Sequence, residues 1–229
     1  MTIKSNQSLA SGHRSRLRER FMTGGNSALA DYELLEMVLF AAHPRGDVKP
    51  LAKQLIQHFG SFAGVIEASP EALSSVENVG DSAIAAIKLV GAAAERLLKQ
   101  QASEGPIIQS WTALLDYCKV AMAAKKVEEF RILFLDAKHK LIGDEVQNRG
   151  TIDHTAVYPR EVLKRALEFH ASAIILVHNH PSGDPTPSKA DIDMTKAIVQ
   201  AARALNISVH DHLIIGKKGH YSFKSNGLI

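Results

Sequence analysis

The sequence predicts an α/β protein, in which an all-helical N-terminal region precedes a three-layer α/β domain with a mixed sheet. Two observations lead to this prediction. Residues 28–99 carry apolar residues at helical spacing, whereas beyond residue 110 short apolar runs alternate with amphipathic helical segments. A polar stretch with a glycine-proline pair, QQASEGPIIQS, separates the two parts. We therefore predict a helical region over 1–100, a linker over 101–110 and a second domain over 111–229.

The composition is that of an ordinary globular chain. Of 229 residues, 45% are hydrophobic and 22% are charged. The single cysteine, Cys118, excludes an intrachain disulfide and a cysteine-based zinc framework. No apolar run approaches the roughly 20 residues of a membrane span, and the first residues lack the apolar core of a signal peptide. We expect a soluble cytoplasmic protein without membrane association, and the sequence does not indicate its oligomeric state.

The first helical segments lie within residues 28–59. The stretch ALADYELLEMVLF has a broad apolar face, HPRGDVKP interrupts the pattern with two prolines and a glycine, and LAKQLIQHFG resumes it. Gly60 stands where a glycine ends many helices in the left-handed conformation. The pattern predicts two helices separated by a loop.

A hairpin follows in the second half of the helical region. Ser69 and Pro70 are typical of an N-cap and a first helical position, and a long helix is predicted from Ser82 to about Lys99. The turn at 78–80 between them is similar to a helix-hairpin-helix motif, which binds DNA phosphates through backbone amides. Asn78 replaces the usual first glycine, and Asp81 would repel a phosphate. A packing unit without a ligand is therefore the alternative.

A basic segment precedes these helices. Residues 1–20 contain five basic residues against one acidic residue, while the net charge of the whole chain is only +3. Such an arm is compatible with contact to nucleic acid, and a solvated tail is the alternative. Weak non-specific DNA contact through residues 13–20 and 78–83 is the partner prediction for this half of the chain.

The second domain reads as helices alternating with strands. A helix is predicted from TALLDYCKVAM onward, then two strands in FRILFLDAKHKLIGDEV around a turn at 137–140. An amphipathic helix in YPREVLKRALEFHA, a buried strand in SAIILVHNH and a helix in SKADIDMTKAIVQAARAL follow. ISVHDHLIIGKKGHYSFKS closes the chain with two strands. Two helix layers around one sheet account for this order.

Two histidines end the buried strand. His178 and His180 are two residues apart, so their side chains point to the same side of the strand. The carboxyl ends of strands are the usual ligand sites of α/β sheets, and Asp191 begins the next helix. Two imidazoles and a carboxylate form a three-ligand zinc site with a fourth position for water, which is typical of catalytic zinc. Alternatively, Ser188 and Asp191 form a capping box and the histidines are structural.

The spacing of these residues resembles a known pattern. His178-x-His180, seven residues, Ser188, two residues and Asp191 resemble the JAMM motif of MPN-type metalloproteases. The longer string HNHPSGDPTPSKAD, with GTIDHTAVYPREVL before it and DHLIIG and YSF after it, resembles the RadC family. ALADYELL and VENVGDSAIAAIK are similar to the helical region of that family. The resemblance implies an MPN/JAMM fold for the second domain.

The resemblance also implies a glutamate upstream of the motif that acts as the general base. The candidates are Glu128, Glu129, Glu145 and Glu161, and Glu129 fits best because it directly precedes the apolar strand FRIL. Glu128 is the fallback, and a solvated glutamate at a helix end is the alternative reading of Glu129. By the same resemblance, the Ser188 hydroxyl would donate to the oxyanion of a tetrahedral intermediate.

The function implied is zinc-dependent hydrolysis of an amide bond, by a peptidase or isopeptidase acting on a protein or peptide. In this reading His178, His180 and Asp191 hold Zn²⁺, and Glu129 and Ser188 are catalytic. Asp211, His212 and His220 are candidates for orienting a ligand imidazole, with surface or turn roles as the alternative. The alternative is a DNA-associated accessory protein in repair or recombination, and a metal-dependent nuclease ranks third. The missing Cys-x-x-Cys pair excludes a zinc deaminase.

Overall fold

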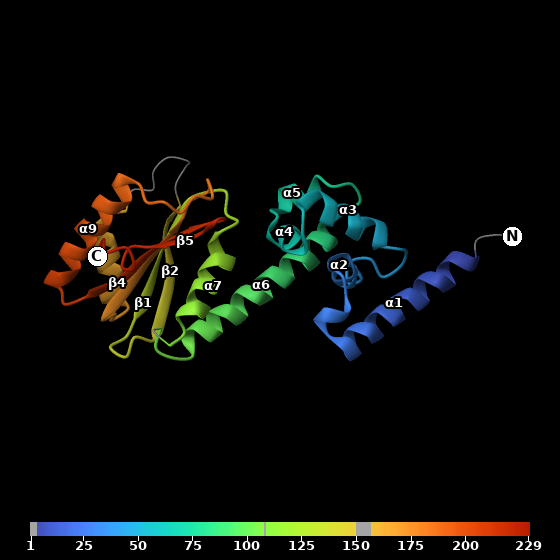
Figure 1. The fold of residues 1–229 in the computed structure, drawn as a ribbon, viewed down its shortest axis with the longest axis horizontal. Coiled ribbons are helices and arrows are strands. Elements are labelled where there is room, and N and C mark those ends of the chain that lie inside the picture. The colour runs from blue at the N-terminus through green and yellow to red at the C-terminus, as the bar shows by residue number, and fades with distance from the viewer. Residues whose placement is uncertain (1–3, 108, 150–156) are drawn as a thin grey trace. The chain divides into compact units, whose positions relative to one another are not determined.

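The computed structural model describes residues 4–107, 109–149 and 157–229, so the GTIDHT part of the motif region lies outside the described residues. The chain divides between Ala93 and Ala94 into two compact units (Figure 1). This boundary falls inside one long helix, α6 (Asp81–Ser103), and differs from the predicted linker at 101–110. The first predicted linker residues, 101–103, continue the helix because the helix-breaking residues of this stretch, Gly105 and Pro106, come only after them.

The first unit is helical, as predicted. Its helices pack around one apolar core that includes Leu35, Leu55 and Ile87, all fully buried. The elements are α1 (Lys4–Gly24), the 3-10 turn η1 (Asn26–Ala28), α2 (Asp31–Leu39), α3 (Lys49–Phe59), α4 (Phe62–Glu67), α5 (Pro70–Ser74) and the first part of α6.

Local sequence signals set the ends of these helices. Gly60 ends α3 with a φ of 83°, and the Ser69 hydroxyl accepts the Ala72 amide at the start of α5, as the sequence predicts. Asn78 adopts a φ of 66°, the conformation for which the hairpin motif ordinarily uses glycine. The hairpin backbone therefore forms despite the substitution.

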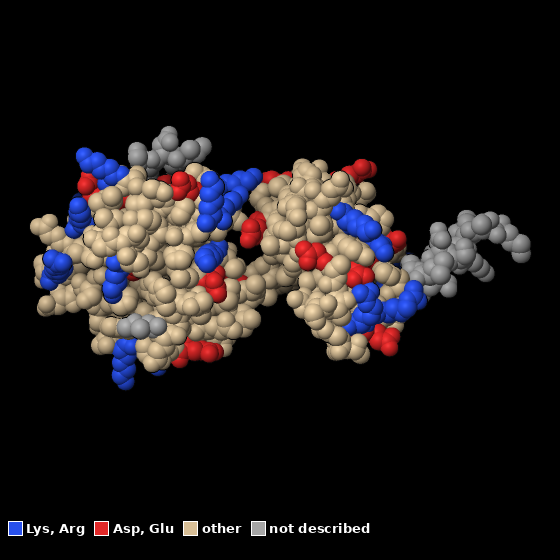
Figure 2. Space-filling model, in the orientation of Figure 1, with Lys and Arg blue, Asp and Glu red and all other residues tan. Residues whose placement is uncertain are grey.

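The basic segment is part of helix α1 rather than a free tail. Leu17 is buried, which fixes this helix to its unit. The Arg14 guanidinium donates to the carbonyl oxygens of His43 and Gly46, and Arg20 is paired with Glu33. Two of the basic residues predicted for DNA contact are thus engaged inside the unit, and Figure 2 shows basic and acidic side chains interspersed on the visible face.

The second unit is built on a five-stranded mixed sheet with the strand order β2-β1-β3-β4-β5. Strands β3 and β4 are parallel, and the other neighbours are antiparallel. Its elements are α7 (Trp111–Met122), β1 (Glu129–Leu135), β2 (Leu141–Arg149), α8 (Pro159–Glu168), β3 (Ala173–Asn179), α9 (Lys189–Ala204), β4 (Ser208–Gly216) and β5 (Gly219–Ser222).

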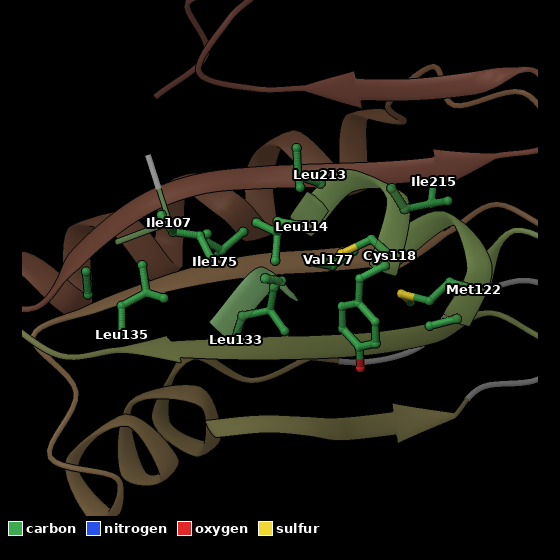
Figure 3. Packing of buried hydrophobic residues seen from close by; sticks show 14 residues of the cluster. Ile107, Leu114, Cys118, Met122, Leu133, Leu135, Ile175, Val177, Leu213 and Ile215 are labelled. Carbon is green, nitrogen blue, oxygen red and sulfur yellow. The ribbon is translucent and has the colours of Figure 1, made fainter. Parts of the chain in front are cut away.

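Helices cover both faces of this sheet, so the unit has the three layers that the sequence predicts. Helix α7 packs Leu114 and Cys118 against one face, where Leu133, Ile175 and Leu213 form a continuous apolar layer (Figure 3). Helices α8 and α9 cover the opposite face through a second cluster. Both faces are apolar because the central strands are buried on each side.

The strand period of two decides which residues share a face. In β1, Phe130 and Ile132 belong to the cluster beneath α8 and α9, whereas Leu133 and Leu135 belong to the cluster beneath α7. The same alternation applies to the polar residues at the strand ends. It therefore determines which glutamate can face the histidines.

No helix in the described part of the chain is both long enough and apolar enough to cross a membrane.

Gly143 on β2 is required by close packing. A Cβ atom built there would lie 2.5 Å from the ring of Phe169, which stacks on Phe134 with ring centroids 4.3 Å apart. We expect Gly143→Ala to lower the free energy of unfolding by about 1–3 kcal/mol through overpacking. Denaturant unfolding checks this value. Gly105→Ala is the matched control, because its nearest neighbour atom would be 3.9 Å away, and a similar loss in both variants would contradict the packing argument.

Candidate metal centre

The two histidines meet at the carboxyl end of β3. His178 lies within the strand and His180 directly follows it, and their Nε2 atoms are 3.1 Å apart. The N-terminus of α9 brings Asp191 to the same point, with Oδ1 3.3 Å from His178 Nε2 and Oδ2 3.6 Å from His180 Nε2. The tertiary structure thus assembles the three predicted ligands.

The loop after β3 orients the ring of His180. Its Nδ1 lies 2.8 Å from the carbonyl oxygen of Asp184, which can only accept a hydrogen bond, so the ring proton is on Nδ1. The loop closes through Gly183, whose φ of 86° and hydrogen bond to the His180 carbonyl form a tight turn. His180 Nε2 is therefore left with a lone pair.

His212 and Thr195 orient the ring of His178. Burial, and then the neighbouring His178, lower the pKa of His212 well below its usual value, so this ring is neutral. The Thr195 hydroxyl donates to the Asp191 carbonyl at 2.5 Å, so its oxygen accepts from His212 Nδ1 at 2.6 Å. His212 Nε2 then accepts from His178 Nδ1 at 2.8 Å. The chain of bonds leaves the lone pair of His178 on Nε2.

Asp211 fixes the position of His212 from the strand. One of its carboxylate oxygens accepts the His212 amide at 2.7 Å, and the other accepts the Ser222 hydroxyl at 2.6 Å. Asp211 is buried, and its described hydrogen bond to His212 is to the backbone amide. It supports the orienting histidine rather than a ligand ring.

Asp191 is held by the capping box at the start of α9. The Ser188 amide and hydroxyl donate to its Oδ2 at 2.7 and 2.6 Å, and the Asp191 amide donates back to the Ser188 hydroxyl. The capping and ligand readings of Asp191 are therefore compatible, because Oδ1 remains directed at His178. Capping aims the carboxylate.

The electrostatics of the centre favour a positive charge between the rings. Burial raises the pKa of Asp191, but the contacts with His178, His180 and Ser188 outweigh it and hold this pKa well below the usual range. The contact with Asp191, followed by the Asp184 carbonyl and the charges of Asp191 and Glu128, raises the pKa of His180 against the effect of burial. A proton or a metal cation can supply this charge.

The donor set fits a zinc-type cation. Two lone pairs facing each other at 3.1 Å repel unless a cation lies between them. Ligands bound to zinc at 2.0–2.2 Å in tetrahedral geometry are separated by about 3.4 Å, close to the three separations found here. In the described ranges, His178, His180 and Asp191 are the group of histidine, cysteine and acidic residues that could hold a metal ion.

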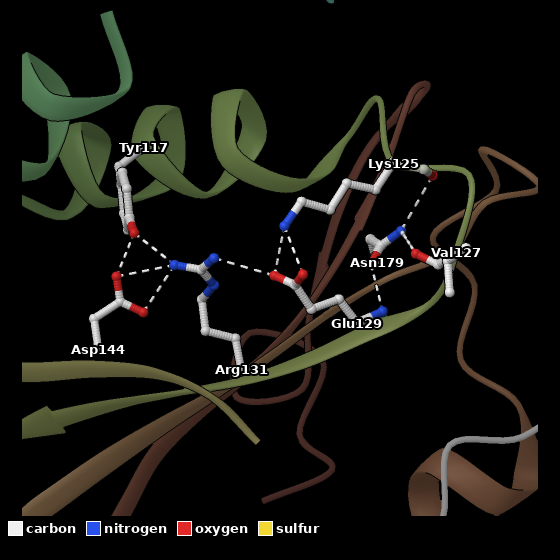
Figure 4. Close-up of polar contacts among 7 residues, drawn as sticks. All are labelled: Tyr117, Lys125, Val127, Glu129, Arg131, Asp144 and Asn179. Atoms are coloured by element: carbon white, nitrogen blue, oxygen red, sulfur yellow. Dashed lines mark hydrogen bonds and ion pairs between the residues drawn. The ribbon is translucent and has the colours of Figure 1, made fainter. Parts of the chain in front are cut away.

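Glu129 lies on the other face of the sheet from the histidines. Its side chain points toward α7, where the ammonium group of Lys125 donates to both carboxylate oxygens at 2.6 Å (Figure 4). Arg131 donates to it at 3.1 Å and also binds Asp144. Burial raises the pKa of Glu129, but these cations outweigh it and lower the pKa below the usual value. This geometry argues against the predicted role of Glu129 as general base.

Glu128 directly precedes β1, and continuing the strand alternation by one residue directs its side chain away from that of Glu129, toward the histidine side. It precedes Phe130 by two residues, and the Phe130 ring stacks on His178 with centroids 6.1 Å apart. Its charge is close enough to His180 to contribute to the raised pKa of that ring. The other two candidates are engaged elsewhere, Glu145 with Arg165 and Glu161 with Arg160. The geometry favours the fallback glutamate.

Sequence reasoning missed two residues of the site. Thr195 follows Asp191 by four residues on one face of α9, so helical spacing could have indicated it. Asn179 lies between the two histidines, and its amide bonds to the backbone on both sides of Glu128. No spacing rule relates Asn179 to a segment some fifty residues earlier in the chain. The DNA contacts through residues 13–20 and 78–83 stay a prediction.

Comparison with known protein families agrees with this architecture. Residues 108–228 match the family model of the RadC-like JAB domain, and residues 11–85 match the UPF0758 N-terminal model. The first match includes every residue of the metal centre. A JAMM-like metallohydrolase fold is therefore the fold of the second unit.

Two bacterial relatives match over nearly their full length. A UPF0758 protein of Rhodobacter capsulatus is 58% identical over 213 residues, which cover 93% of this chain and 100% of that protein. A UPF0758 protein of Ruegeria pomeroyi is 56% identical over 217 residues, which cover 95% of this chain and 97% of that protein. With both halves matched and the motif residues assembled in one centre, the chain belongs to the RadC family.

Proposed function

We propose that the chain is a zinc-dependent hydrolase of amide bonds, a peptidase or isopeptidase that acts on a protein or peptide. One observation carries the proposal. The Nδ1 protons of His178 and His180 are directed away from the centre, so that two Nε2 lone pairs and the Asp191 carboxylate converge. Three such ligands leave one coordination position for water, the arrangement of catalytic zinc.

Three residues would bind the metal, and a fourth would act as the general base. His178, His180 and Asp191 would hold the zinc ion, which when bound acts as a Lewis acid and activates water. Glu128, on the histidine side of the sheet, would accept a proton at its carboxylate and return it to the leaving nitrogen. Glu129 is unsuited to this role because its carboxylate is already paired with Lys125 and Arg131.

Ser188 would bind the developing negative charge on the substrate. Its hydroxyl donates to Asp191 Oδ2 in the substrate-free protein, and the Ser188 amide donates to the same oxygen. The hydroxyl can therefore turn to a substrate carbonyl oxygen while the amide keeps Asp191 in place.

Metal content tests the proposed centre. We expect the purified protein to contain close to one zinc ion per chain, and the double variant His178→Ala/His180→Ala to contain almost none, because the remaining carboxylate is a single ligand. Mass spectrometry of the metal content measures both. A wild-type protein that takes up no zinc even after reconstitution would contradict the proposal.

The zinc affinity should depend on pH. The contact with Asp191 raises the pKa of His180 in the protein without metal, so protons compete with the metal at a higher pH than they would at a free imidazole. Below that pKa, each displaced proton should weaken zinc binding about tenfold per pH unit, whereas well above it the affinity should level off. Competition with a chromophoric chelator at pH 8, 7 and 6 measures the trend. An affinity that is constant over this range contradicts it.

The two neighbouring glutamates can be separated by activity. With zinc-loaded protein and a library of quenched fluorescent peptides, we expect Glu128→Gln to lower the hydrolysis rate at least 100-fold, since general acid–base catalysis contributes about 10²–10⁴. Glu129→Gln removes a charge from the α7 side of the sheet, so the variant should keep most of the activity. Its free energy of unfolding should be lower, because Lys125 and Arg131 lose a partner. The reverse result would restore Glu129 as the base.

A further inference from the structure

The backbone ladder between β1 and β3 stops next to the metal centre. Its last pair joins Phe130 to His178. Beyond this pair, the side chain of Asn179 takes over the contact between the two strands, and this side chain is only 1% exposed. A side-chain amide carries the same donor and acceptor as a peptide group, so Asn179 extends the ladder where the backbones have separated.

Both polar groups of the Asn179 amide contact the segment that carries Glu128. Oδ1 accepts the Glu129 amide at 2.8 Å, and Nδ2 donates to the Val127 carbonyl at 3.2 Å, with the Lys125 carbonyl 3.5 Å away (Figure 4). The orientation of the amide is unambiguous, because exchanging its oxygen and nitrogen would set donor against donor and acceptor against acceptor. The backbone is therefore fixed immediately before and immediately after Glu128.

A second contact holds the same segment on the α7 side. Lys125 and Glu129 form an ion pair four residues apart, and Arg131 binds the same carboxylate. The Glu129 side chain is anchored on the α7 face, and Glu128 directly precedes β1, so the alternation of the strand, continued by one residue, directs Glu128 toward the histidine face. The anchoring of Glu129 and the amide of Asn179 thus act on one short stretch of chain.

We infer that Asn179 is a positioning residue, which holds the backbone around Glu128 so that the carboxylate of Glu128 faces the metal centre. This inference rests on the proposed function, in which Glu128 is the base. Asn179 lies between His178 and His180, so the strand that supplies two ligands also sets the place of the base. The distance between the metal ligands and the base is then fixed by Asn179, and not by the loop before β1 alone.

Few other side chains can replace this amide. The contact with this segment needs an acceptor for the Glu129 amide and a donor for the Val127 carbonyl, both in one plane within a buried site. A shorter or apolar side chain leaves both backbone groups unpaired and frees the segment to move. The metal ligands themselves remain, since neither histidine bonds to the Asn179 side chain among the described contacts.

The experiment uses zinc-loaded full-length protein with acetohydroxamic acid as the probe. This compound chelates zinc and gives a proton to a nearby carboxylate, so its affinity reports on Glu128 without any substrate. Titration calorimetry compares the wild type with Glu128→Gln, Asn179→Ala and the double variant. Asn179→Leu is a second variant of nearly native volume. Tyr117→Phe is the control, because it removes a buried hydroxyl from the contacts of Arg131 and Asp144 without touching the Asn179 amide.

We expect zinc affinity within about twofold of wild type in the Asn179 variants, and acetohydroxamate affinity about tenfold weaker in Glu128→Gln and in each Asn179 variant. The double variant should be no weaker than Glu128→Gln alone, because both changes remove the same contact. Amide exchange at Glu129 should be faster in the Asn179 variants and unchanged in Tyr117→Phe. A general loss of stability would not produce this non-additivity.

The possible failures are distinguishable. If Glu128→Gln weakens the probe while the Asn179 variants bind it like the wild type, or if the two losses multiply, the positioning role is overturned and the proposed function stands. If the wild type takes up no zinc, or if Glu128→Gln has no effect on the probe, the assigned centre or its base is wrong and the inference falls with it.

Discussion

The site depends on the alternation of side chains at the end of one buried strand. Because β3 has a period of two, His178 points to the face beneath α9 and the side chain of Asn179 points to the face beneath α7, and His180 follows where the strand ends. A shift of β3 by one residue would move the imidazoles away from Asp191. It would also exchange the side chains that pack against α7 with those that pack against α8 and α9. The apolar packing on both faces of β3 is therefore what fixes the position of the ligands.

Hydrogen bonds then decide the chemistry that these ligands can perform. A histidine can bind a metal through either nitrogen, and the partner of the other nitrogen makes the choice. Here a loop carbonyl accepts a hydrogen bond from Nδ1 of His180, and the buried neutral His212, itself fixed by Thr195, accepts one from Nδ1 of His178. The same helix start that supplies Asp191 also supplies the carbonyl that orients Thr195. The capping of α9 and the orientation of the candidate metal ligands therefore share one set of contacts.

The sequence predicted the layers, most elements and the three residues that converge at the candidate metal centre, and it placed the predicted base at Glu129, whose side chain lies on the other face of the sheet. In the sequence, Glu128 and Glu129 are adjacent and both stand directly before the apolar strand, so either one fits the role. Only the register of β1 against β3 places Phe130 opposite His178 and so turns Glu129 toward Lys125 and Arg131. The domain boundary differs for a similar reason, because α6 continues across it and local composition cannot show which core each turn of a helix joins.

By itself the sequence determined what depends on neighbours in the chain: helical and strand periodicity, the caps at Ser69 and Ser188, the left-handed Gly60, and a motif whose residues lie within fourteen positions. Tertiary structure alone decided what depends on partners distant in the chain. It placed His212 behind His178, bound Arg14 and Arg20 inside the helical unit, and set Asn179 against the segment of Glu128. Local geometry is fixed by bonded neighbours, whereas a buried donor or acceptor takes whichever partner the packing brings within reach.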